Sequence, residues 1–232
     1  MATPAQLCQL ASPWQRNLPL WAIGEQKIDA FRGLYLRDHT GRPGLFTRNG
    51  QTIPGAEHIL HQLAAFERHA GQRLFIDGEY CVGDGPDTLA STKRWVESGH
   101  KLGGTAGTFY AFDCLPYDDW FRGGTDTPWF ERKARLEALA LAVESDEAHR
   151  WDWRPGARGD EPNPVRVVPH VDLWTVDDAL QLVAEFWRAG LEGAVIKDAE
   201  AGYWRTRNAS WQKVGRPWQD KIHWREAAIA LP

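Results

Sequence analysis

The chemistry that this chain can perform starts from one short polar stretch, EQKIDAFRG, which contains Lys27, Asp29 and Arg32. A lysine amine becomes a nucleophile when burial or a neighbouring cation lowers its pKa and releases the unprotonated form. If residues 23–29 are extended, Lys27 and Asp29 point to the same face, because side chains alternate along a strand. A solvated edge of charged residues would give the same pattern, so this stretch alone leaves both interpretations open.

Two further stretches would bring carboxylates and a second lysine to the ends of strands. In IDGEY, Asp77 and Glu79 share one face, and the glycine between them permits close approach of a ligand. In LEGAVIKD, Glu192 opens an apolar strand that carries Lys197. Carboxylates can hold a hard cation such as Mg²⁺, and lysines can neutralise phosphate oxygens. A salt-bridged strand end is the structural alternative for such segments.

Aromatic residues accompany these charges. The stretch FYAFD supplies Phe112, which could stack on a nucleobase or belong to the ordinary core. In WQKV, Trp211 and Lys213 share a face of an extended segment. The aromatic and the lysine would then be presented to the same ligand.

The elements that must position these residues follow from hydrophobic periodicity, which indicates a mixed α/β chain. Strands are predicted in LYLRD, GLFTR, RLFIDGEYCV, GTFYAFDCL, VRVVPHV and AVIKD. Helices are predicted in EHILHQLAAFERH, in ERKARLEALALAVES and after Thr175, with apolar stripes formed by Ile59, Leu63 and Phe66, by Leu136, Leu139, Ala140 and Val143, and by Leu180, Val183 and Trp187. Thr175 and Asp178 suggest a capping box, and Gly190 a helix stop. Segments 117–128 and 152–164 are predicted to be surface loops.

Composition excludes several classes of protein. The chain has 232 residues, 43% hydrophobic and 25% charged, with a formal net charge of −4, which describes a soluble globular protein without bulk attraction for nucleic acid. Its three cysteines, Cys8, Cys81 and Cys114, lie far apart, so we expect reduced thiols and a cytoplasmic protein. No stretch has the length and apolarity of a signal peptide or a membrane span, so no membrane partner is expected.

Taken together and in order, the five stretches resemble those of the covalent nucleotidyltransferase superfamily, which comprises ATP-dependent DNA ligases, RNA ligases and mRNA capping enzymes. The resemblance covers roughly residues 21–216 and is greatest to the adenylation domain of small ATP-dependent DNA ligases. It implies an α/β (α+β), ATP-grasp-like nucleotidyltransferase domain, in which two antiparallel sheets packed with helices enclose a nucleotide cleft. We expect residues 1–232 to form this single domain, with no C-terminal OB-fold domain, because residues 217–232 are too few to build one.

The resemblance also implies a role for individual residues. Lys27 would attack the α-phosphate of ATP and carry AMP to a 5′-phosphate at a nick. The other implied contacts are Glu25 to the adenine, Arg32 and Glu79 to the ribose and ligand, Arg48 as the arginine of the family's S/T-R-x-G segment, Phe112 to the base, and Lys197 and Lys213 to the α-phosphate, with Asp29 and Asp77 in support. Glu79 and Glu192 would hold the implied cofactor, Mg²⁺ or Mn²⁺.

Two positions depart from the family pattern. Ala30 replaces the glycine that follows the motif aspartate, which adds a methyl group where the chain usually bends. Gly215 stands where a second lysine usually lies, so one phosphate contact is missing unless Arg216 or Lys221 replaces it. We expect Ala30 to be tolerated at some cost, whereas the missing phosphate contact at Gly215 bears on the rate of adenylation.

The leading prediction is therefore an ATP-dependent DNA ligase that acts on nicked double-stranded DNA, as a monomer, with a DNA-clamping OB-type domain or protein in trans as a candidate partner. An RNA ligase or capping nucleotidyltransferase shares the nucleotide site and stays open. A nucleotide- or nucleic-acid-binding module without turnover is an alternative of another class, and the catalytic half of a split enzyme is a third. A metal-dependent hydrolase is disfavoured, because the eight histidines show no HExxH or HxH spacing.

Overall fold

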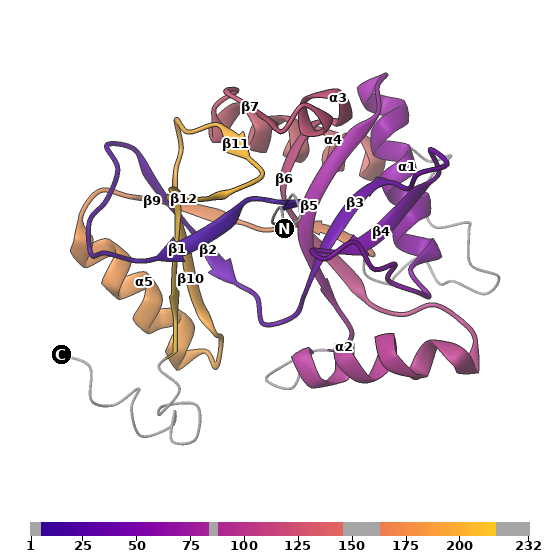
Figure 1. Cartoon of the computed structure of the whole chain (residues 1–232). Helices are drawn as coiled ribbons and strands as arrows, with labels where there is room; N and C mark the ends of the chain where they lie inside the picture. Colours follow the sequence, from indigo (N-terminus) through magenta and orange to yellow (C-terminus); the bar gives the residue numbers. More distant parts are fainter. Residues whose placement is uncertain (1–5, 84–87, 146–162, 217–232) are drawn as a thin grey trace, which may run out of the picture.

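The computed structural model describes residues 6–83, 88–145 and 163–216, and within them the chain forms two five-stranded sheets that lie side by side (Figure 1). The first sheet has the order β1-β12-β10-β2-β9. Its strands are β1 (Leu10–Pro13), β12 (Arg207–Gly215), β10 (Gly193–Asp198), β2 (Ala22–Lys27) and β9 (His170–Leu173). Helix α5 (Val176–Arg188) covers one face of this sheet.

The second sheet has the order β4-β3-β5-β6-β8. Its strands are β4 (Pro43–Thr47), β3 (Phe31–Arg37), β5 (Leu74–Cys81), β6 (Thr108–Pro116) and β8 (Val165–Val167). Both sheets are mixed, because β1 runs parallel to β12 and β8 runs parallel to β6. The prediction of two antiparallel sheets is therefore corrected at one edge of each sheet. At each of these edges the outermost strand is distant in sequence from its neighbour, so no hairpin connection forces the two strands to run antiparallel.

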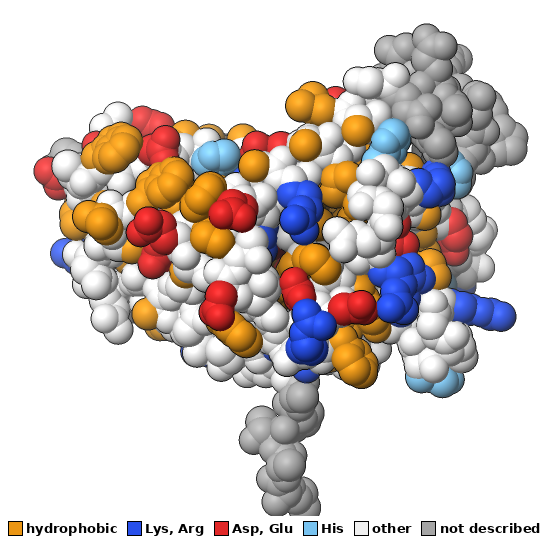
Figure 2. Space-filling view, turned by 90° about the horizontal axis from the view of Figure 1, so that it is seen from above, with side chains coloured by type: hydrophobic (Ala, Val, Ile, Leu, Met, Phe, Trp, Pro, Cys, Tyr) orange, Lys and Arg blue, Asp and Glu red, His pale blue; other side chains and the backbone are white. Residues whose placement is uncertain are grey.

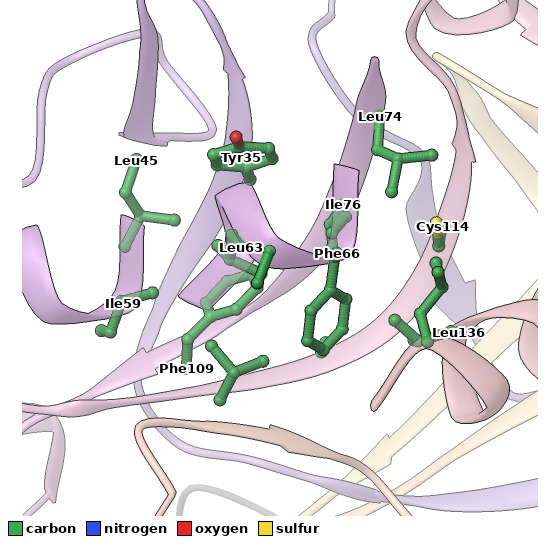
Figure 3. Packing of buried hydrophobic residues seen from close by; sticks show 14 of the residues in the cluster. Tyr35, Leu45, Ile59, Leu63, Phe66, Leu74, Ile76, Phe109, Cys114 and Leu136 are labelled. Atoms are coloured by element: carbon green, nitrogen blue, oxygen red, sulfur yellow. The ribbon is translucent and has the colours of Figure 1, made fainter. Parts of the chain in front are cut away.

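The largest core cluster lies between the second sheet and two helices, α1 (Glu57–Ala70) and α4 (Trp129–Ser145). Ile59, Leu63 and Phe66 of α1 are fully buried against strand residues such as Tyr35 and Ile76, as Figure 3 shows. The stripe predicted for α4 is confirmed, since Leu136, Leu139, Ala140 and Val143 belong to this cluster. The helices thus pack on one face of the second sheet and hold in place the strands that carry predicted site residues.

The remaining elements are small. They are α2 (Thr88–Glu97), the 3-10 helix η1 (Gly99–Leu102), α3 (Tyr117–Phe121), and a two-stranded ribbon of β7 (Gly124–Thr125) and β11 (Tyr203–Trp204). The segment 117–128, predicted to be a loop, therefore contains α3 and β7. Most of the other predicted loop, 152–164, lies outside the described residues. Among the described residues, no helix is long and apolar enough to cross a bilayer.

Two predictions about individual elements need correction. The stretch VRVVPHV forms two strands, β8 and β9, in different sheets, because the chain crosses between the sheets there. In α5 the capping box of Thr175 and Asp178 is present, but Leu180 is 42% exposed and the buried positions are Ala179, Val183 and Ala184. The small residues allow α5 to pack closely on the sheet.

A bulge in β6 redirects the side chains of that strand. Asp77 of β5 pairs with Asp113 and Gly78 pairs with Ala111, so Phe112 is the extra residue. Ala111 and Cys114 consequently both face the core under α1 and α4, whereas Phe112 faces a second cluster on the opposite side. A bulge commonly changes the direction of a functional side chain in this way.

Candidate active site

A cleft of about 520 Å³ opens between the two sheets. It is lined by β1, β2, β10 and β12 of the first sheet and by β3, β5 and β6 of the second, together with the turn after β4 and Leu89 of α2. All the predicted site residues line this cleft except Asp77 and Glu192, each of which contacts a lining residue, Arg32 and Lys27 respectively. Seen from above, Lys and Arg side chains gather near the middle of the molecule and toward the second sheet (Figure 2).

Lys27 is the last residue of β2, and its ammonium forms an ion pair with the Glu192 carboxylate. Glu192 comes directly before β10, whose first residue, Gly193, pairs with Lys27 in the sheet. The two side chains are 24% and 13% exposed, so the amine stands at the border of the cleft. Asp29 also borders the cleft, but β2 ends at Lys27, so the predicted shared strand face does not exist.

Arg32 is held by Asp77 through two parallel hydrogen bonds of 2.5 and 2.6 Å from Nε and Nη2. The Tyr203 hydroxyl donates a further hydrogen bond of 2.5 Å to Asp77. The guanidinium lies 4.6 Å from the centre of the Phe112 ring. Burial raises the pKa of Asp77, although Arg32 and the hydroxyl counteract this effect. The predicted supporting role of Asp77 thus corresponds to a contact with Arg32.

Glu79 follows on the same side of β5, as strand alternation predicts. Burial raises the pKa of its carboxyl to about 8, against a usual value of 4.5, and Arg32 and Lys27 only partly offset this. Glu79 therefore lies in a place where a further positive charge would stabilise its ionised form.

Glu25 and Lys197 both line the cleft and are both buried. The Glu25 carboxylate is 2.7 Å from the ammonium of Lys133 and 2.5 Å from that of Lys197. The Lys197 ammonium also lies 4.7 Å from the centre of the Phe112 ring and 4.3 Å from that of Trp211. Burial lowers the pKa of Lys197, while Glu25 acts in the opposite direction.

Two other cations, Arg48 and Lys213, are exposed at the cleft. Arg48 stands in the turn after β4, and Lys213 shares the cleft face of β12 with Trp211, as predicted. The missing lysine at Gly215 is not replaced by Arg216, whose Nη2 donates to the Trp187 carbonyl of α5 at 2.6 Å. Lys221 lies outside the described residues.

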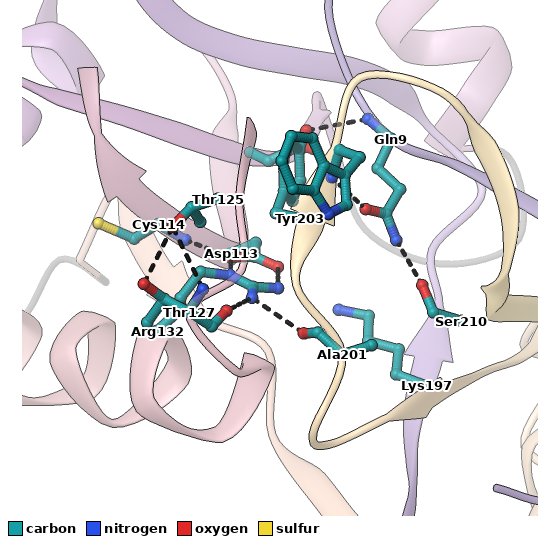
Figure 4. Close-up of polar contacts among 12 residues, drawn as sticks. Gln9, Asp113, Cys114, Thr125, Thr127, Arg132, Lys197, Ala201, Tyr203 and Ser210 are labelled. Atoms are coloured by element: carbon teal, nitrogen blue, oxygen red, sulfur yellow. Dashed lines mark hydrogen bonds and ion pairs between the residues drawn. The ribbon is translucent and has the colours of Figure 1, made fainter. Parts of the chain in front are cut away.

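Sequence reasoning missed Lys133 and the buried ion pair of Arg132 and Asp113. Both basic residues are on α4 and are at most 2% exposed, and Figure 4 shows Arg132 between Asp113 and the Ala201 carbonyl. One signal was available: Lys133 lies three residues before Leu136, on the apolar stripe of the helix. A charged residue on a buried stripe indicates a partner within the fold.

Two carboxylates near Lys27, Glu79 and Glu192, are the candidate ligands for a divalent cation. Among residues 6–83, 88–145 and 163–216, no group of three His, Cys, Asp or Glu side chains could hold a metal. Glu79 and Glu192 are nevertheless close enough to influence each other, and both surround Lys27. Mg²⁺ is commonly bound by one or two carboxylates and by substrate phosphates, so these two residues fit it.

Two five-stranded sheets with a cleft between them define the class of fold, and comparison with known proteins identifies the family. The family model described as ATP dependent DNA ligase domain matches residues 6–214, and the chain belongs to this family.

The chain is similar to three proteins in particular. It is 28% identical over 197 residues to the multifunctional non-homologous end joining protein LigD of Pseudomonas aeruginosa, covering 84% of this chain and 20% of that protein. It is 22% identical over 183 residues to the DNA ligase of African swine fever virus, covering 78% of this chain and 37% of that protein. The ATP-dependent DNA ligase of bacteriophage T7, solved in complex with ATP, superposes on this chain with a TM-score of 0.69 at 15% identity, and the match covers 90% of this chain and 68% of the T7 ligase. The chain thus spans only a minor part of both curated relatives.

Proposed function

We propose that this chain performs the nucleotidyl-transfer chemistry of an ATP-dependent DNA ligase and seals nicks in double-stranded DNA. The observation that carries the proposal is the position of Lys27, at the border of a cleft whose other sheet contributes Arg32, Glu79 and Phe112. The family match supports ATP and DNA as substrates. We further propose an ATP-grasp-like site in which the nucleotide occupies the cleft between the sheets.

The residues support a reaction in three steps. The unprotonated Lys27 amine attacks the α-phosphorus of ATP; a P–N bond forms, and the bond to pyrophosphate breaks. Lys27 is an ammonium in its ion pair with Glu192, so one proton must leave before the attack, and Glu192 is placed to receive it; the second proton leaves to solvent as the P–N bond forms. A 5′-phosphate oxygen of DNA then attacks the same phosphorus and the P–N bond breaks. The 3′-hydroxyl oxygen finally attacks the phosphorus of the 5′-phosphate; its proton leaves to solvent, and the bond to AMP breaks as the phosphodiester forms.

The cations of the cleft contribute by positioning and charge neutralisation, which dominate catalysis of transfer at phosphorus. Arg48 and Lys213 are exposed and can contact phosphate oxygens, whereas Lys197 is buried beside Phe112 and Trp211. Glu79 and Glu192 would hold Mg²⁺ or Mn²⁺, which supplies additional positive charge for the phosphates.

The partners and the compartment remain part of the proposal. A DNA-clamping OB-type domain or protein would act together with this chain on DNA, and the chain itself would be a cytoplasmic monomer. Cys8, Cys81 and Cys114 are all buried thiols, which supports a reducing compartment.

The test is the intact mass of the protein after treatment with pyrophosphate and incubation with ATP and Mg²⁺. We expect one added AMP, which pyrophosphate removes again and which Lys27→Ala abolishes. Lys93→Ala, an exposed lysine of α2, is the matched control and should retain the adduct. ATP binding without an adduct, across pH and metal ions, would favour the binding module. If the adduct forms, nicked DNA and nicked RNA substrates distinguish a DNA ligase from an RNA ligase.

A further inference from the structure

Glu25 is held by two lysines from different elements. Its Oε1 accepts a hydrogen bond of 2.7 Å from Lys133 of α4, and its Oε2 lies 2.5 Å from the ammonium of Lys197 of β10. All three side chains are at most 3% exposed, yet Glu25 and Lys197 line the cleft. The group carries two positive charges and one negative charge, so the ionised form of Glu25 is fully compensated.

Lys133 is itself fixed from several directions. Its ammonium donates to the Val168 carbonyl and lies 5.7 Å from the centre of the Trp129 ring. Val168 follows β8 of the second sheet and hydrogen-bonds to Ala111 of that sheet, whereas Glu25 belongs to the first sheet. Lys133 therefore ties the Glu25 carboxylate to the opposite wall of the cleft and restricts its position.

The carboxylate keeps acceptor capacity after both lysines have bound. An ionised carboxylate offers about four acceptor positions; Lys133 occupies one, and the ammonium of Lys197 lies against the other oxygen as an ion pair. The remaining positions match a hydrogen-bond donor such as the 6-amino group of adenine. Hypoxanthine presents an acceptor, its oxo oxygen, at the 6 position, where the carboxylate would repel it, and its nearest donor is N1–H instead.

We propose that Lys133 is a positioning residue that holds Glu25 for recognition of the adenine amino group, and that it thereby determines nucleotide choice. This inference rests on the proposed nucleotidyl transfer and on Glu25 as the adenine contact. Lys133 reaches the nucleotide only through Glu25, because Lys133 does not line the cleft.

The test compares charging of Lys27 by ATP and by ITP, which carries hypoxanthine. The rates of adduct formation are measured at varied nucleotide concentration for wild type, Lys133→Met, Lys133→Arg and the control Lys93→Met. A hydrogen bond to a charged group strengthens binding affinity by about 10- to 100-fold. We expect Lys133→Met to lower the ATP-to-ITP ratio of kcat/KM by about tenfold or more, chiefly by raising KM for ATP. Lys133→Arg should restore most of the preference.

Each outcome decides between the inference and a purely structural role. A structural role would lower the melting temperature of Lys133→Met but leave the ATP-to-ITP ratio of the folded fraction unchanged, which would overturn the inference. If Lys133→Met does not fold, Lys133→Gln retains one donor and replaces it. Wild type that charges with ATP and ITP equally well also refutes the inference, whereas wild type that charges with neither refutes the proposed function.

Discussion

The ion pair of Arg132 and Asp113 provides the most informative stability measurement in this fold. Arg132 donates to Asp113 through Nε and Nη2 at 2.7 and 2.9 Å, and the two side chains are 2% and 0% exposed. Its Nη1 also donates to the carbonyls of Thr127 and Ala201. One guanidinium thus joins β6, α4 and the turn between β10 and β11, beside the cleft.

The substitution Arg132→Met removes all four contacts. Breaking a buried ion pair from one side costs about 3–5 kcal/mol, because the other charge stays buried without compensation. Asp113 would retain a hydrogen bond from the backbone N–H of Cys114. The loss is a large part of the free energy of unfolding of a domain, which is roughly 5–15 kcal/mol. The matched control is Arg73→Met, whose partner Asp118 is 68% exposed and whose pair should contribute about 0–1 kcal/mol.

The double variant Arg132→Met/Asp113→Leu separates the two parts of the effect. Removing both charges abolishes the uncompensated carboxylate, so most of the loss should be recovered. The carbonyls of Thr127 and Ala201 would still lack their donor, which leaves a deficit of about 1 kcal/mol for each.

The assay is urea unfolding followed by tryptophan fluorescence, with the free energy of unfolding extrapolated to water. The reasoning is refuted if Arg132→Met costs no more than Arg73→Met. It is also refuted if the double variant is no more stable than Arg132→Met, because the buried carboxylate would then not be the cause.

Three further predictions concern other features of the fold. Glu79 should make the protein less stable as pH rises from about 4.5 to about 8, because the folded state keeps the proton that the unfolded chain releases; urea unfolding at several pH values should show this slope, and an equal slope in Glu79→Gln would contradict it. Thr175→Ala should cost about 1 kcal/mol by removing the capping box of α5, and an unchanged unfolding midpoint would argue against that role. Gly193→Ala should lower the melting temperature by disrupting the pairing of β10 with β12, because Gly193 has a φ of 147° and a Cβ there would overlap the Val214 carbonyl oxygen; a melting temperature equal to wild type would exclude this clash.

Local patterns in the sequence accounted for most elements and for the content of the cleft. Strand alternation correctly placed Asp77 with Glu79 and Trp211 with Lys213, because side chains two residues apart on a strand must share a face. Helical spacing likewise predicted the buried stripes of α1 and α4. These features depend on neighbours within a few residues, so the order of amino acids determines them.

Other features depended on contacts between distant segments, and only the tertiary structure decided them. The parallel edge strands, the bulge that changes the phase of β6 after Phe112, and the ion pair of Lys27 with Glu192 leave no periodic trace in the sequence. The same holds for Lys133, whose partner Glu25 is 108 residues away. The sequence therefore determined which residues could perform nucleotidyl transfer, whereas the packing of the sheets determined their partners, because burial and charge pairing arise only when the whole chain is folded.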